Sequence, residues 1–167
     1  MKPSLNPNLV YLYAAAMVAT VRNRLHAKKA LRRGKPALAR LLNALGSSES
    51  AHARRFLMYL RGKTSDSDVF LREYRQSKET EIAPGYTAKA QYYEQAGKKG
   101  KAKNFREFER VVAAQANLVA RYQTENEDMP GDIYVCQVCG FVSTVQPLAN
   151  CPICNAVKGK FDRFDSK

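Results

Sequence analysis

Two C-x-x-C pairs near the C-terminus constrain this chain more than any other feature. Cys136 and Cys139 form the first pair, Cys151 and Cys154 form the second, and the sequence has no further cysteine. Each pair lets two thiolates converge from one tight turn, and two such turns supply tetrahedral S4 ligation for one metal ion. A redox dithiol or a disulfide staple is the alternative, which this spacing favours less. The sequence therefore predicts a metal site at these four cysteines.

The residues that follow the two pairs agree with knuckle-shaped turns. Gly140 follows Cys139 and Asn155 follows Cys154. The backbone after the second cysteine of a knuckle tends to be left-handed, which glycine adopts at no steric cost and asparagine tolerates next best. Backbone N–H groups in such turns can hydrogen-bond the sulfurs and tune a redox potential. The spacing alone leaves both iron and zinc open as the occupant.

Helical periodicity fills most of the chain before the cysteines. Asn6-Pro7 is a capping residue followed by proline at the first helical position, and Pro84-Gly85 predicts a kink or a short break within the third helix. Short connections between long helices imply antiparallel neighbours and hence an up-down bundle. The four predicted helices span residues 7–33, 36–61, 66–97 and 102–123.

The predicted domain organisation follows from this pattern. Residues 1–124 form an all-α four-helix bundle, residues 125–131 form a linker that ends in Pro-Gly, and residues 132–167 form a small knuckle domain. The second helix carries a predicted core stripe of large apolar residues that also includes Glu49 and His52. The apolar members are Leu38, Leu41, Leu42, Leu45, Phe56 and Leu60.

Charge is distributed unevenly along the chain. The net charge is +13, and residues 1–63 hold 13 Lys and Arg against a single acid, Glu49. This asymmetry suggests an acidic partner, either protein or nucleic acid, although a solvated basic face without a partner fits equally well. The apolar run Leu9–Val21 is too short to span a bilayer and has no signal-peptide cleavage site, so we expect a cytoplasmic protein without a membrane partner.

The residues around the cysteines resemble the C-terminal rubredoxin module of the rubrerythrin family. The resemblance rests on Tyr134-Val-Cys136-x-x-Cys139-Gly140-Phe141, Pro147, Cys151-Pro152-x-Cys154, Ala156, Lys158 and Phe161. Members of that family join a ferritin-like four-helix bundle to this module, in the order found here. The resemblance implies one iron that cycles between the ferric and ferrous states as a one-electron carrier. It also implies a homodimer, with a redox partner that the sequence does not identify.

The bundle departs from the family pattern at the positions of a second metal centre. Rubrerythrins hold two irons between six glutamates and a histidine and reduce hydrogen peroxide. Glu49-Ser-Ala-His52-Ala-Arg-Arg-Phe56 resembles the family's Glu-x-x-His motif, but most other ligand positions carry apolar or basic residues. These are Val18, Ala116 and Val119, with Arg75 and Lys78 in one register of the third helix, or Lys78 and Glu81 in the other. We expect the di-iron site to be lost, with Lys78 or Arg75 paired to Glu49.

Three functions follow from these features. The first is a rubrerythrin-like electron-transfer protein that uses a mononuclear iron site. The second is a zinc-ribbon nucleic-acid-binding protein on a basic helical platform, which the charge of residues 1–63 favours. The third is a peroxide-reducing di-iron enzyme; by resemblance the chain is an oxidoreductase, but the missing acids argue against peroxidase activity.

Overall fold

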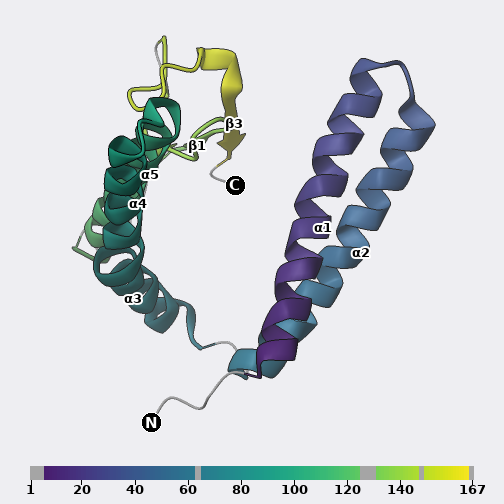
Figure 1. Cartoon of the computed structure of the whole chain (residues 1–167), viewed down its shortest axis with the longest axis horizontal. Helices are drawn as coiled ribbons and strands as arrows, with labels where there is room; N and C mark the ends of the chain where they lie inside the picture. Colours follow the sequence, from purple (N-terminus) through teal and green to yellow (C-terminus); the bar gives the residue numbers. More distant parts are fainter. Residues whose placement is uncertain (1–5, 63–64, 125–130, 147–148, 166–167) are drawn as a thin grey trace. The chain divides into compact units, whose positions relative to one another are not determined.

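The computed structural model describes residues 6–62, 65–124, 131–146 and 149–165, which fall into two compact units, residues 1–65 and 66–167 (Figure 1). Most of the predicted linker and Pro147 lie outside the described residues. Among the described helices, none combines the length and the apolar character needed to cross a bilayer.

The first unit is a hairpin of two helices, α1 (Pro7–Arg32) and α2 (Pro36–Arg61). The Asn6 side chain accepts hydrogen bonds from the N–H groups of Asn8 and Leu9 at 3.0 and 3.3 Å, so it caps α1 as predicted. Gly34 has a φ of 67° in the turn between the helices, where a side chain would be strained. Both predicted helices are therefore confirmed to within a residue.

Small residues form the seam between α1 and α2. Gly46 approaches α1 so closely that an added Cβ would lie 3.4 Å from the Thr20 carbonyl oxygen. The other buried residues of the hairpin are Ala16, Thr20, Ala27, Ala30, Ala39 and Ala53. Leu38, Leu41 and Leu45 of the predicted core stripe lie outside this seam and are 44–56% exposed, so their place in a four-helix core stays a prediction. Small side chains let the two backbones approach, and the leucines then flank the seam instead of filling it.

The second unit begins with one nearly continuous helical stretch. It comprises α3 (Ser67–Ser77), the π-helical turn η1 (Lys78–Ile82) and α4 (Ala83–Gln95). Of the predicted kink or short break at Pro84-Gly85, the break does not occur, because α4 includes both residues. Pro84 has no N–H and its ring crowds the preceding turn, and the chain widens into a π turn there, with Ala83 N–H bonded to the Lys78 carbonyl.

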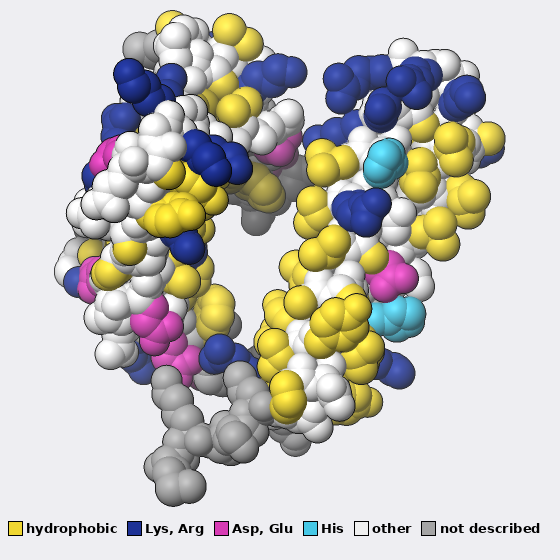
Figure 2. Space-filling model, in the orientation of Figure 1, with side chains coloured by type: hydrophobic (Ala, Val, Ile, Leu, Met, Phe, Trp, Pro, Cys, Tyr) yellow, Lys and Arg dark blue, Asp and Glu magenta, His cyan; other side chains and the backbone are white. Residues whose placement is uncertain are grey.

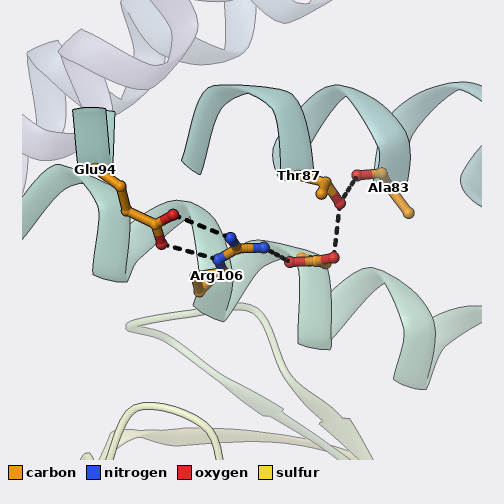
Figure 3. Close-up of polar contacts among 5 residues, drawn as sticks. Ala83, Thr87, Glu94 and Arg106 are labelled. Carbon is orange, nitrogen blue, oxygen red and sulfur yellow. Dashed lines mark hydrogen bonds and ion pairs between the residues drawn. The ribbon is translucent and has the colours of Figure 1, made fainter. Parts of the chain in front are cut away.

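Helix α5 (Lys99–Thr124) packs against α4 through aromatic rings and a polar network. The rings of Tyr86, Tyr93, Phe105 and Phe108 contact one another at centroid distances of 5.5–6.0 Å. Arg106 donates hydrogen bonds at 3.2 Å to the carboxylates of Glu94 and Glu109, and the Thr87 hydroxyl donates to Glu109 at 2.6 Å (Figure 3). These contacts hold α4 and α5 together on one side of the unit.

The C-terminal part of the second unit is a small antiparallel sheet with two cysteine turns. Its strands are β1 (Ile133–Cys136), β2 (Val142–Ser143) and β3 (Phe161–Phe164), in the order β2-β1-β3. Cys136 pairs with Phe161 across β1 and β3, which ties the first knuckle to the chain after the second. The predicted fold class, helices followed by a small cysteine-bearing knuckle, is confirmed.

Candidate metal centre

The four cysteine sulfurs lie at the separations that one tetrahedral metal ion requires. All four Sγ atoms are within 4.8 Å of one another, with 3.7 Å between Cys136 and Cys154 and 3.6 Å between Cys139 and Cys151. A tetrahedron with metal–sulfur bonds of about 2.3 Å has sulfur–sulfur edges of about 3.8 Å. All four cysteines are free of disulfides. The structure therefore brings the four predicted ligands together, and their geometry fits one ion.

Two backbone hydrogen bonds shape each knuckle. In the first, Cys136 N–H donates to the Phe141 carbonyl at 2.8 Å, and Gly140 N–H donates to the Cys136 carbonyl at 2.9 Å. The second knuckle repeats both bonds, from Cys151 to Ala156 and from Asn155 to Cys151, at 2.8 and 2.9 Å. The two turns are thus equivalent, and each presents its pair of sulfurs towards the other pair.

The residue after each pair has the predicted left-handed conformation. Gly140 has a φ of 81° and Asn155 a φ of 62°, and Asn155 is the one described residue other than glycine with a positive φ. The Asn155 side-chain oxygen accepts a hydrogen bond from the Asn150 side-chain amide at 2.9 Å. This bond joins the end of the second knuckle to the residue just before it. Local side-chain bonding of this kind is why asparagine tolerates this region.

The electrostatics of the cluster favour a bound cation. Burial raises the pKa of Cys139 well above its usual range and also raises the pKa of Cys154. Burial opposes ionisation of Cys136 too, but N–H groups of Cys139 and Val138 hold the pKa of Cys136 below its usual value. Buried thiols that must ionise together repel one another, so a metal cation at their centre compensates the cost.

The knuckle packs against α5 within the second unit. Val111 is buried in the same cluster as Cys136, Cys139 and Cys151. Arg110 donates a hydrogen bond to the Pro152 carbonyl at 3.1 Å, and Gln115 donates one to the Gly140 carbonyl at 3.5 Å. The sequence analysis did not identify the roles of Arg110, Val111 and Gln115, because helical periodicity does not show which residues of another element a helix contacts.

Glu49 and His52 lie together on α2 but do not face the seam of the hairpin. Glu49 Oε2 is 3.6 Å from His52 Nδ1, and their side chains are 36% and 58% exposed. Gly46 and Ala53 occupy the neighbouring seam positions instead. Within either compact unit, the described residues offer no second cluster of three or more Cys, His, Asp or Glu side chains that could share an ion.

The cations predicted to replace the second metal have local partners. Arg75 Nε lies 2.9 Å from Glu79 Oε1, one helical turn away. Lys78 Nζ lies 4.8 Å from the centre of the Tyr74 ring. Their pairing with Glu49, which belongs to the other compact unit, stays a prediction. The same holds for the di-iron positions Val18, Glu81, Ala116 and Val119, whose former role rests on resemblance.

Comparisons with known proteins agree with this geometry. The family model described as "Rubrerythrin, rubredoxin-like domain" matches residues 134–162. Rubrerythrin-2 of Clostridium acetobutylicum is 26% identical over an alignment that covers 91% of this chain and 92% of the relative. Two solved structures of nigerythrin, in a mixed-valence and a partially reduced state, match with TM-scores of 0.53 and 0.50. They are 20% and 19% identical, and each match covers 95% of this chain and 85% of that chain.

The chain shares with nigerythrin a series of helices followed by a small knuckle that carries four cysteines. Its knuckle matches the rubredoxin-like domain of rubrerythrins, and the chain as a whole is similar in sequence to Rubrerythrin-2 and in fold to nigerythrin. The rubredoxin-like match and the four cysteines together indicate a metal-binding site.

Proposed function

We propose that this chain is a rubrerythrin-like electron-transfer protein that holds one iron at Cys136, Cys139, Cys151 and Cys154. The observation that carries the proposal is the convergence of four free sulfurs at tetrahedral separations. Iron bound there supplies one-electron chemistry between the ferric and ferrous states.

The residues around the sulfurs suit a carrier that changes its charge but keeps its shape. Three of the four cysteines are buried, with Val111 against them on one side. The paired backbone bonds of both knuckles hold the sulfurs in place whichever charge the site bears. Val138, between the first two cysteines, is 61% exposed and offers an apolar contact beside the site for a redox partner protein.

We also propose that the di-iron peroxidase centre of the family is lost in this chain. Val18, Ala116 and Val119 have no ligand atom to offer at positions where the resemblance places glutamates. The remaining ligands are Glu49 and His52, with Glu81 in the second register of the third helix, and they supply too little negative charge for two irons. On this proposal the electrons pass to another protein instead of to peroxide.

The proposed assembly is a cytoplasmic homodimer. The dimer is what the resemblance to rubrerythrins implies. Lys and Arg side chains gather at the end of the hairpin where α1 turns into α2 (Figure 2), and this basic end is the proposed contact for an acidic partner.

The decisive experiment is metal analysis and visible spectroscopy of the full chain, grown with ample iron and purified in air. We expect a red protein with about one iron per chain, which reduction bleaches and air restores. A colourless zinc protein with salt-sensitive binding of nucleic acid would instead support a zinc ribbon. About three irons with turnover of hydrogen peroxide would support the di-iron enzyme. Cys151→Ser is the control, because it removes one ligand and should abolish the colour.

A further inference from the structure

Gln115 on α5 connects the helices to the metal knuckle. Its side-chain oxygen accepts a hydrogen bond from the Tyr74 hydroxyl at 3.0 Å, and its side-chain nitrogen donates to the Gly140 carbonyl at 3.5 Å. All three residues belong to the second compact unit. The Gly140 carbonyl can only accept, so the amide nitrogen faces the knuckle, and the amide oxygen is left to accept the bond from Tyr74. Burial raises the pKa of Tyr74, so its hydroxyl stays protonated and remains a donor.

The carbonyl that Gln115 contacts belongs to a peptide group with a second role. The Gly140 carbonyl and the Phe141 N–H are the two ends of one planar peptide. Phe141 is held in the same knuckle as Cys139, because its carbonyl accepts the Cys136 N–H at 2.8 Å, and its own N–H favours the thiolate form of Cys139. A donor on the carbonyl therefore orients the peptide plane and polarises its N–H towards the sulfur.

We propose that Gln115 is a positioning residue for the metal site, which sets the strength of the Phe141 N–H bond to Cys139 through the Gly140–Phe141 peptide. Hydrogen bonds to a ligand sulfur favour the more negative state of the site, which for iron is the reduced one. Gln115 thus favours reduction of the iron. This inference rests on the proposed function for its redox part, whereas the peptide geometry applies to any metal in the four-sulfur site.

The test compares Gln115→Met, similar in size but without a donor, with Gln95→Met, a matched change on an exposed position of α4. In the zinc-loaded full chain, the Phe141 amide proton of Gln115→Met should exchange with solvent about fivefold faster than in the unmodified chain, and the control should not change. In the iron-loaded chain at the unmodified protein's midpoint potential, the ferric-to-ferrous ratio of Gln115→Met should rise about threefold, or ~28 mV for one electron.

A second variant keeps the proposal falsifiable if Gln115→Met fails to hold metal. Tyr74→Phe keeps the ring but removes the hydroxyl that orients the amide, so it should shift both readouts in the same direction. Unchanged Phe141 exchange in both variants, or an unchanged iron ratio in a fully loaded Gln115→Met protein, would overturn the proposal. Faster exchange in a zinc-loaded protein whose iron form does not cycle would support the positioning role and overturn only the proposed electron transfer.

Discussion

Gly140→Ala isolates the backbone conformation on which the first knuckle depends. Gly140 has a φ of 81°, and no heavy atom lies within 4 Å of the position that an added Cβ would occupy. Alanine therefore meets no clash, and its whole cost is the left-handed conformation, about 1–2 kcal/mol for a residue with a Cβ.

This cost should fall on metal binding. The turn must stay left-handed for Gly140 N–H to reach the Cys136 carbonyl and for the sulfurs to converge, whereas the metal-free knuckle can relax. A penalty of about 1–2 kcal/mol corresponds to metal binding that is weaker by about 5- to 30-fold. The assay is competition for zinc against a chromophoric chelator at constant pH, with the full chain reduced throughout.

Gly85→Ala is the matched control. Gly85 lies in α4, has no positive φ and also has open space around an added Cβ. Alanine there should leave zinc affinity unchanged and stabilise the helix by up to about 1 kcal/mol. Equal zinc affinities of Gly140→Ala and the unmodified chain would refute the view that the left-handed turn organises the site.

Three further predictions concern the helices. Thr87→Val removes the 2.6 Å bond to Glu109 (Figure 3) and should lower the unfolding free energy by about 1 kcal/mol at pH 7, measured by urea denaturation. The Thr87 hydroxyl lowers the pKa of Glu109, an effect that burial partly opposes. The bond therefore stabilises the fold fully above the ordinary carboxyl pKa, and this stabilisation is lost as the pH falls through the lowered pKa of Glu109. The difference in unfolding free energy between Thr87→Val and the unmodified chain should accordingly shrink below about pH 4. If assembly buries Glu49 and pairs it with Lys78, Lys78→Met should destabilise the protein by roughly 3–5 kcal/mol in thermal unfolding.

Each of these has a contrary result. A constant deficit of Thr87→Val from pH 7 to about pH 3 would show that the hydroxyl does not act on the Glu109 carboxylate. Thermal stability unaffected by Lys78→Met, alone or together with Arg75→Met, would refute the ion pair with Glu49.

The sequence by itself determined the helices and the cysteine turns, because both depend on local chemistry. Asn6 and Pro7 start α1 through a local cap that does not depend on what the helix packs against. Gly34 allows the turn after α1 because glycine adopts a positive φ without strain. The knuckles are equally local, since each brings its sulfurs together over four residues and needs only a tolerant residue after them, here Gly140 and Asn155.

Only the tertiary structure decided which residues face one another. The leucine stripe of α2 had the right period for a core, yet the seam with α1 consists of Ala39, Gly46 and Ala53, because periodicity gives a face and not its partner. The contact of Gln115 with Gly140 joins positions 25 residues apart and depends on how the knuckle docks on α5. Helix capping and turn preferences act over a few residues, so they do not specify contacts between residues far apart in the sequence, which depend on the packing of the whole fold.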